Sequence, residues 1–263
     1  MKVIFVCSLV SSLLLCAACR PAPSPEAYFK RAQNAAQQLE RNTDEMIRLE
    51  AAGELDLKNR PEQVKVAEGD LEALVDNLTR AADGGHTLAT YALASLYDNP
   101  MFNEQSHQKA CGLYQKAMDQ GLLAAAVGYY HLCDKAYERF DLHNADHLKY
   151  LQALEQLLHK PDVQVDAYPL PAKHSHCFMK VVEPQPELGV LAAAKARGAG
   201  LALTDDQFRA EANYILALTH VDQNDRPDSR NIAYLDKAEA LGCSDFYGLS
   251  AMLREAVPTG TRP

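Results

Sequence analysis

The feature that most restricts the fold of this chain is a short pattern that occurs twice, 36 residues apart. The shared positions are small or apolar residues around a glycine; the copies carry them as Ala81, Gly85, Ala89 and Leu96, and as Ala117, Gly121, Ala125 and Leu132. A partial third copy near the C-terminus supplies Ala238, Gly242 and Leu253 in the same register. A regular period of this length is typical of repeat architectures, in which each unit buries its apolar face only against its neighbours.

Each copy contains the parts of a helix pair. A cation followed by an alanine ends the first helix, where positive charge is favourable at the helix C-terminus. The glycine then supplies a left-handed cap, and a second helix follows at once. Its small residues, Ala89 and Ala125, allow the two helices to approach closely. We therefore predict an all-α fold of antiparallel helix pairs that stack into an α-solenoid.

This pattern resembles the Sel-one-like repeat, a relative of the tetratricopeptide repeat with a slightly longer period. The match is good over residues 71–134, partial over 231–254 and weak between them. The resemblance implies a scaffold that binds other proteins.

Helical periodicity and the positions of prolines divide the rest of the chain into segments. Residues 26–60 contain one amphipathic packing helix, and residues 61–140 contain the two good repeats. Residues 141–203 combine a helix over 144–159, an irregular proline-rich insertion over 161–186 and a degenerate helix over 188–197. Residues 204–263 hold further helices, the first over 205–220 after a capping box formed by Thr204 and Gln207. No segment of useful length alternates like a strand.

The N-terminus has the pattern of an export signal. Lys2 precedes an apolar run of about 16 residues, which is short for a membrane-spanning helix. Ala17 and Ala18 stand directly before Cys19, as in a lipobox, so residues 1–18 are predicted to be a lipoprotein signal peptide and Cys19 the lipidated residue. A lipobox usually has Leu three residues before its cysteine, and this chain has Cys16 there. An ordinary cleaved secretion signal and a retained membrane anchor are the alternatives.

Residues 19–25 are rich in proline and form a tether between the anchor and the folded part. Arg20 follows Cys19 where an Asp would direct retention in the inner membrane of enterobacteria. The resemblance to that sorting rule favours the outer membrane of a Gram-negative bacterium, with the domain facing the periplasm.

Four cysteines remain in the mature chain besides Cys19: Cys111, Cys133, Cys177 and Cys243. In an oxidising periplasm this even number permits two disulfides, with three ways to pair them. Four buried thiols are the alternative interpretation.

The charge of the chain excludes some partners. The full chain has a formal charge of −9, and removal of Lys2 with the leader brings the mature protein to −10. No basic block is present, so nucleic acid is a poor partner, and we expect contact with the membrane only through the lipid anchor.

Motifs for catalysis or metal binding are weak. His143 and His147 lie one helical turn apart but lack the Glu of a zinc protease, so we interpret them as solvated or capping residues. His174, His176 and Cys177 lie in a proline-rich loop without a defined fourth ligand. Ser250 lies in a predicted helix and lacks the final glycine of a nucleophile elbow. The sequence therefore predicts no enzyme, no metal site and no cofactor.

Exported lipoproteins with Sel-one-like repeats resemble the immunity proteins that neutralise phospholipase effectors of type VI secretion systems. The resemblance implies binding of a secreted toxin in the envelope, where an acidic surface would attract a basic partner. An envelope adaptor for surface polymers or secretion machinery is the alternative within the binding class. A cell-wall hydrolase is a remote alternative, supported only by the predicted compartment.

Overall fold

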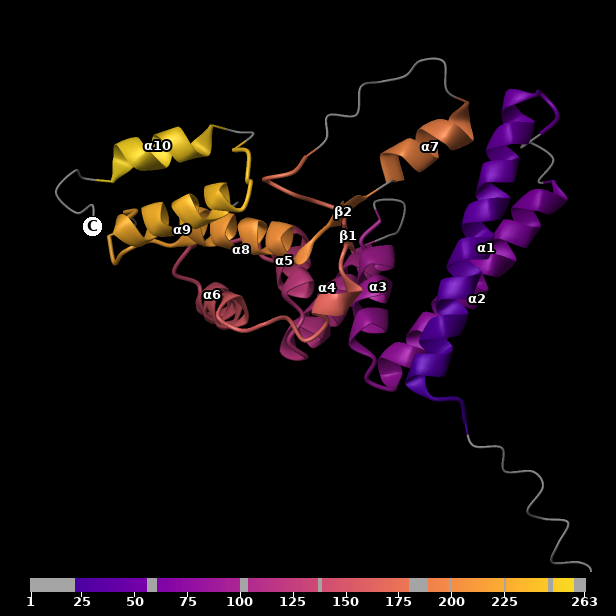
Figure 1. The fold of residues 1–263 in the computed structure, drawn as a ribbon, viewed down its shortest axis with the longest axis horizontal. Helices are drawn as coiled ribbons and strands as arrows, with labels where there is room; N and C mark the ends of the chain where they lie inside the picture. Colours follow the sequence, from indigo (N-terminus) through magenta and orange to yellow (C-terminus); the bar gives the residue numbers. More distant parts are fainter. Residues whose placement is uncertain are drawn as a thin grey trace, which may run out of the picture.

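The computed structural model describes residues 22–55, 61–99, 104–136, 139–179, 189–198, 200–224, 226–245 and 248–257. Ten α-helices, one 3₁₀ helix and one two-stranded sheet form the regular structure of these ranges (Figure 1). The prediction of an all-α fold is confirmed at this level. The predicted leader and Cys19 lie outside the described residues.

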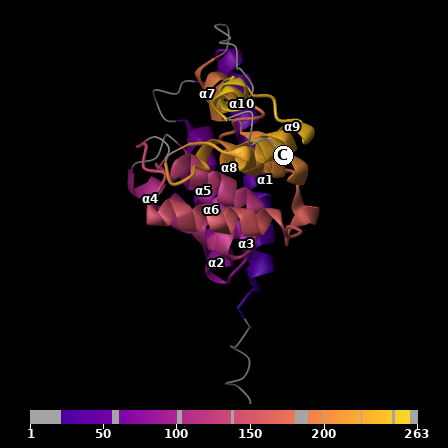
Figure 2. The ribbon, with the colours of Figure 1, turned by 90° about the vertical axis from the view of Figure 1, so that its left-hand side faces the viewer.

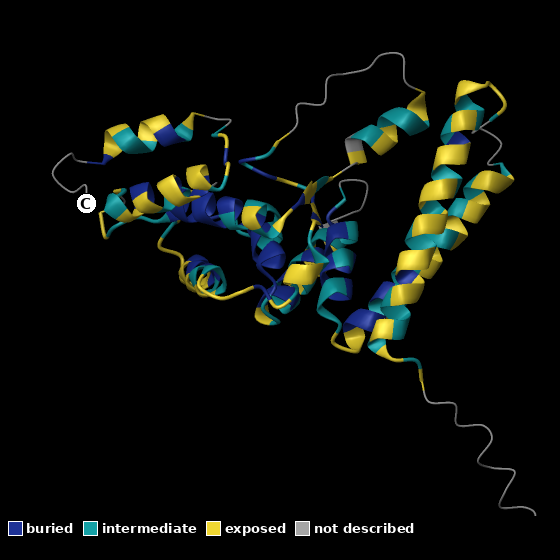
Figure 3. Ribbon diagram, in the orientation of Figure 1, coloured by how far each residue is buried: buried dark blue, intermediate teal, exposed yellow. Residues whose placement is uncertain are grey.

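The N-terminal helix pair extends away from the rest of the chain. Helix α1 (Pro25–Ala51) is capped by the Ser24 hydroxyl, which accepts from the Ala27 amide at 3.2 Å. It ends at Ala51, shortly before Gly53, where φ is +70°, and is the one packing helix predicted for the segment 26–60. Helix α2 (Glu62–Asp83) packs along its length. Most of the upper part of the pair is exposed or half-buried, and the core lies at its base (Figure 3).

Helices α3 (Thr87–Tyr97), α4 (Glu104–Asp119) and α5 (Leu123–Leu132) follow. Each packs against the next one along the chain. Thus α2 with α3, and α4 with α5, are the two helix pairs that the good repeat copies predict.

Identical turns close the first helix of all three repeat copies. The glycines have left-handed backbone, with φ of +88° at Gly85, +94° at Gly121 and +89° at Gly242. The amide after each glycine donates to the carbonyl of the repeat alanine five residues earlier: His86 to Ala81 at 3.0 Å, Leu122 to Ala117 at 3.2 Å and Cys243 to Ala238 at 3.0 Å. This is a Schellman motif, and it satisfies carbonyls that the helix leaves open.

The repeat alanines are small because helices meet there. Ala81, Ala117 and Ala238 are completely buried, as are Ala89 and Ala125 at the start of the second helices. The copies also hold one another. Lys116 of the second copy donates to the carbonyl of Ala82, at the end of α2, at 2.7 Å.

The third copy departs from the first two after its cap. Helix α9 (Ser229–Ala240) ends in the shared turn, but α10 (Leu249–Ala256) begins seven residues after Gly242 rather than two. Cys243 forms a disulfide in this intervening loop, and the Asp245 carboxylate accepts from the Ser250 amide at the start of α10. Leu253 keeps the same sequence distance from its glycine as Leu96 and Leu132. Because the loop is longer, however, Leu253 lies nearer the start of its helix than they do.

The middle of the chain contains the element that the sequence does not predict. Strand β1 (Leu170–Ala172) pairs antiparallel with β2 (Leu201–Leu203), with Leu170 opposite Leu203. Each strand has three residues, too few to show alternation, and the pairing joins segments far apart in the chain. The sheet is therefore compatible with a sequence in which no segment of useful length alternates like a strand.

The helices around this sheet lie close to their predicted ranges. They are α6 (Ala145–Leu158), α7 (Val190–Gly198) and α8 (Asp205–Thr219), and a 3₁₀ helix spans Val165–Ala167. The predicted capping box is confirmed, because Thr204 and Gln207 bond reciprocally at the start of α8.

The order in which the helices pack differs from their order in the sequence. After α5 the next helix in the packing order is α8, and α9 packs against α8. Helix α6 contacts both α5 and α8 (Figure 2), whereas α7 reaches across to α1 (Figure 1). The main core forms where α4, α5, α6 and α8 meet, around Tyr114, Leu123, Leu154 and Phe208.

Two disulfides connect these layers. Cys111 of α4 pairs with Cys133 at the end of α5, and Cys177 in the loop after β1 pairs with Cys243 after α9. The bonded residues are 22 and 66 positions apart. Loops of these lengths correspond to about 3 to 4 kcal/mol of stabilisation per bond through the entropy of the unfolded chain.

Candidate functional site

The residues singled out in the sequence fall into structural and surface groups. The repeat alanines and glycines form helix caps and close helix contacts, and the four mature cysteines form the two disulfides. Cys19, the predicted lipid site, lies outside the described residues. None of the described positions in this set brings reactive groups together at a surface.

The histidines of the proline-rich loop lie in a cluster. His174 and His176 approach His131 of α5, with ring centroids 5.8 and 4.7 Å from the His131 ring. His131 is 9% exposed and His174 is 54% exposed. Among the described residues there is no group of three His, Cys, Asp or Glu side chains arranged to hold a metal ion.

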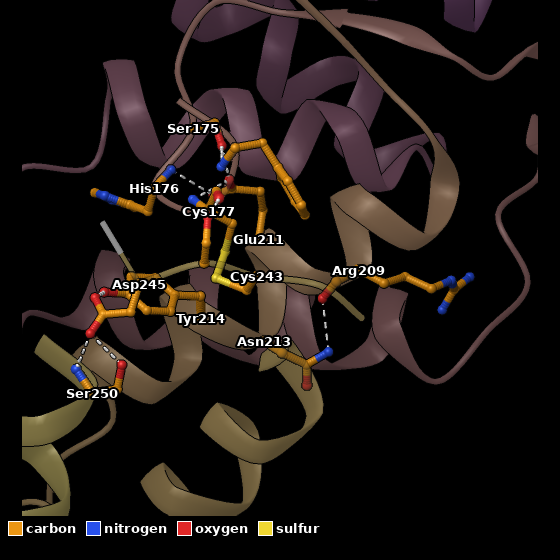
Figure 4. Close-up of a disulfide and its surroundings, with 12 residues drawn as sticks. Ser175, His176, Cys177, Arg209, Glu211, Asn213, Tyr214, Cys243, Asp245 and Ser250 are labelled. Carbon is orange, nitrogen blue, oxygen red and sulfur yellow. Dashed lines mark hydrogen bonds between the residues drawn. A yellow bond between two sulfur atoms is a disulfide. The ribbon is translucent and has the colours of Figure 1, made fainter. Parts of the chain in front are cut away.

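Beneath these histidines, a buried carboxylate holds the loop to α8 (Figure 4). Glu211 is fully buried and accepts from the Cys177 amide at 2.8 Å, from the His176 amide at 3.0 Å and from the Ser175 hydroxyl. The disulfide from Cys177 to Cys243 lies next to this contact (Figure 4). Three donors occupy the carboxylate, so its geometry suits anchoring of the loop rather than proton transfer to a ligand.

The charges of this cluster follow from its burial. Burial alone would raise the pKa of Glu211, but His131, the Ser175 hydroxyl and the Cys177 amide outweigh it, so the pKa lies below its usual value. Burial lowers the pKa of His176 to about 4, with repulsion from His131 and His174 acting in the same direction against the attraction of Glu211. At neutral pH the cluster therefore contains an ionised Glu211 beside a neutral His176.

Sequence analysis did not single out Glu211 or His131. The available signal for Glu211 was a charged residue within the most apolar stretch of α8, flanked by the buried Ala210 and Ala212. A single acid in an apolar helix does not identify its partners, because the loop that supplies them lies more than thirty positions earlier in the chain.

His147 has a different position from the one predicted. The sequence suggested a solvated or capping residue, but His147 is 3% exposed, and its Nδ1 contacts Asp134 Oδ2 at 2.5 Å. Asn144, not a histidine, caps α6, because its side chain accepts from the Asp146 amide at 2.9 Å. His147 therefore lies in the first turn of α6, where its ring meets Asp134 just beyond the end of α5.

The candidate binding surface is a groove at the base of the N-terminal helix pair. Its volume is about 310 Å³, and its lining is mainly apolar. The lining residues are Phe29, Ala32, Gln33 and Ala36 of α1, Leu74 and Leu78 of α2, Ala92, Ser95 and Leu96 of α3, and Lys173 of the loop after β1. A partly apolar groove between helices suits an inserted side chain or helix of a partner.

The helices that form this groove are also the most acidic part of the described chain. Residues 22–55 and 61–83 contain twelve acidic and six basic residues, a net charge of −6. Three of the bases lie in local ion pairs with acids on the same helix, namely Arg48 with Glu45, Lys65 with Glu62 and Arg80 with Asp76. The acidic residues of α1 and α2 that have no such partner produce a negative potential, which attracts a cationic surface.

Within the described ranges, no helix combines the length and the apolar character needed to cross a membrane. Comparison with known proteins gives no match to this chain, whether among protein-family models, curated proteins or solved structures.

Proposed function

We propose that this chain is an exported, lipid-anchored protein of the bacterial envelope that binds another protein and does not catalyse a reaction. The observation that carries the proposal is the apolar groove between α1, α2 and α3, set in the most acidic part of the described chain. An apolar anchor site with charge around it is the common composition of a specific protein interface.

Two observations support export. The N-terminal sequence has the pattern of a lipoprotein leader that ends before Cys19. All four cysteines of the described residues are joined in disulfides, which persist in oxidising compartments such as the periplasm. The proline-rich tether at 19–25 would hold the folded domain close to the membrane surface.

We further propose that the partner is a secreted antibacterial toxin and that the protein acts as an immunity protein. The support is the resemblance of the repeat and leader to immunity lipoproteins of phospholipase effectors of type VI secretion, together with the net charge of −6 on the helix pair beside the groove. An immunity protein must meet its toxin quickly, and a surface of net negative charge accelerates association with a basic partner. We expect an interface on the order of 1,600 Å² or more.

The direct test is co-expression of the full chain with the product of the adjacent gene, directed to the periplasm. Rescue of growth from a toxic neighbour, with a stable one-to-one complex on a sizing column, is the expected result. A harmless neighbour, or toxicity that persists despite folded protein, would replace this proposal with the envelope adaptor.

A matched pair of variants tests the groove itself. Gln33 lines the groove, whereas the exposed Gln37 lies one turn later on the same helix outside its lining. Both variants add the same charge to α1, but only Gln33→Arg changes the lining of the groove. Gln33→Arg should therefore weaken the complex, and Gln37→Arg should leave it unchanged. Equal affinities for the two variants would place the interface elsewhere.

A further inference from the structure

A second pocket lies on α8, between α6 and α9, both of which pack against α8. Its volume is about 320 Å³, and its lining is mainly apolar, with Leu158 of α6 and with Tyr234 and Leu241 of α9. The lining residues of each helix recur every three or four positions, so each helix presents one face to the pocket. We call this site the α8 pocket.

Hydrogen bonds hold the walls of the α8 pocket in place. The Tyr234 hydroxyl of α9 donates to the Glu155 carboxylate of α6. The Arg209 guanidinium of α8 donates to two carbonyls at the end of α6, at 3.0 and 3.1 Å. Arg209 also pairs with Asp205 at 2.7 Å, so its charge is compensated within α8. The pocket is thus formed before any ligand arrives, which reduces the cost of binding.

The α8 side of the pocket has a polar group with an unused acceptor. Asn213 is 6% exposed, and its Nδ2 donates to the Arg209 carbonyl at 2.8 Å (Figure 4). Its Oδ1 has no hydrogen-bond partner among the described residues, yet it does not belong to the buried atoms that lack one. The oxygen is therefore accessible from the pocket that Asn213 lines, and it can accept from an N–H group.

The rim of the α8 pocket is cationic. Lys237 is exposed, and its Nζ lies 5.4 Å from the centre of the Tyr234 ring, whose face attracts the ammonium. Within the described ranges no acid pairs with Lys237, and the exposed His159 belongs to the same lining. Arg209 and Lys237 against Glu155 give the lining a formal charge of +1, in a chain whose total is −9. The site therefore favours an anionic group next to an apolar one.

We propose that the α8 pocket binds the end of a polypeptide chain whose last residue is apolar. The apolar side chain packs against Leu158 and Leu241, the terminal carboxylate pairs with Lys237, and the last backbone N–H donates to Asn213 Oδ1. One residue offers these three groups together only where a chain ends, because an internal residue has no carboxylate on its backbone. An acidic side chain would bring the charge without the apolar group.

The α8 pocket shares no helix with the groove of α1, α2 and α3. A chain end can therefore dock here whatever protein occupies the groove. The test below uses no toxin, so its failure is distinguishable from failure of the immunity proposal.

The experiment titrates the purified full chain, held in lipid nanodiscs to keep detergent out of the apolar pocket, with blocked pentapeptides. The main probe consists of glycine and serine and ends in leucine with a free carboxylate. One control has a terminal amide, and the other ends in glycine. Calorimetry measures the affinities, and the NMR signals of the Asn213 side-chain amide report binding at this site.

We expect saturable binding of the leucine acid, with a shift of the Asn213 signals, and about tenfold weaker binding of each control. No saturable binding of the leucine acid, or equal binding of its acid and amide forms, would overturn the proposal. N-acetyl-leucine probes a free acid as the source of the same groups. Tighter binding of N-acetyl-leucine than of the pentapeptide would overturn the assignment to a chain end.

Variants at two positions separate the roles of charge and hydrogen bonding. Lys237→Gln changes an exposed side chain and should weaken binding of the leucine acid about tenfold without affecting the amide form, because only the acid carries the charge. Asn213→Ala should weaken both forms alike, since both donate the same N–H.

Lys149→Gln is the matched control, because Lys149 is exposed on α6 outside the lining and the charge change is the same. Melting temperatures show that each variant is folded. Equal affinities of Lys237→Gln and Lys149→Gln for the leucine acid would overturn the carboxylate contact and the proposal with it.

Discussion

At the scale of single residues, the repeat depends on a few backbone positions that only glycine occupies easily. Gly121 has φ of +94°, and a Cβ atom built there would lie 3.3 Å from Val163 Cγ1. The position therefore carries both a conformational and a steric constraint, whereas Gly112, within α4, has open space around it.

Gly121→Val should lower the free energy of unfolding by about 1 to 2 kcal/mol or more, because a branched side chain is strained in the left-handed region. Gly112→Val is the control and should change stability by less than about 0.5 kcal/mol, as exposed helix substitutions usually do. Thermal melting measures both. Equal melting temperatures for the wild type and Gly121→Val would remove the structural basis of the repeat assignment.

The histidine cluster predicts a stability that falls in acid. His176 has a pKa of about 4 in the folded chain, below the ordinary value of 6.5, so the unfolded chain binds more protons between these values. The contribution of the neutral ring is present above pH 6.5 and is lost as the pH falls toward 4. The lowered pKa of Glu211 adds a further loss below 4.5, its ordinary value.

His176→Gln should flatten the dependence of stability on pH between 6.5 and 4, the window set by the shifted pKa. His159→Gln, which changes an exposed histidine, should retain it. Urea unfolding at a series of pH values gives the comparison. A slope unaltered by His176→Gln would show that another group accounts for the acid sensitivity.

At the scale of elements, α7 is fastened to the distant end of α1 by its first turn. The Glu50 carboxylate of α1 accepts from the Val190 amide at 2.9 Å and from the Leu191 amide at 3.0 Å. Lys195 of α7 also pairs with Asp44 of α1. A residue 140 positions away thus takes the place of a local helix cap.

Glu50→Ala should destabilise the docked α7 by about 1 kcal/mol, the usual effect of losing an N-cap acceptor. Amide hydrogen exchange should show faster exchange in α7, with the base of the α1 and α2 pair unchanged. Glu54→Ala removes an exposed acid just beyond α1 and serves as the control. If exchange in α7 is equal in the two variants, the capping role of Glu50 is wrong.

At the scale of the whole molecule, the proposed tether and lipid anchor would set where the folded domain can act. If Cys19 carries the lipid, Cys19→Ser should move the protein from the membrane fraction to the soluble periplasmic fraction. The folded domain should keep its melting temperature, since residue 19 precedes α1 in the sequence. Cell fractionation with a periplasmic marker protein measures the change. Soluble behaviour of both wild type and variant would favour an ordinary secreted protein.

The sequence by itself determined the features that depend on neighbouring residues. Helical periodicity, the capping box of Thr204 with Gln207 and the glycine turns after Ala81 and Ala117 each involve contacts within one or two helical turns. The ranges of α6 and α8 could therefore be predicted to within one residue.

Contacts between distant segments were decided only by the tertiary structure. Examples are the choice of cysteine pairs, the packing of α5 on α8 and the pairing of β1 with β2. In each case the local sequence of one segment does not identify the distant segment that it contacts. Burial of Glu211 and of His147 belongs to the same class, because a polar side chain is stable inside only when a remote donor or acceptor meets it. The groove has the same origin, since three helices define it together and none of them forms a concave surface alone.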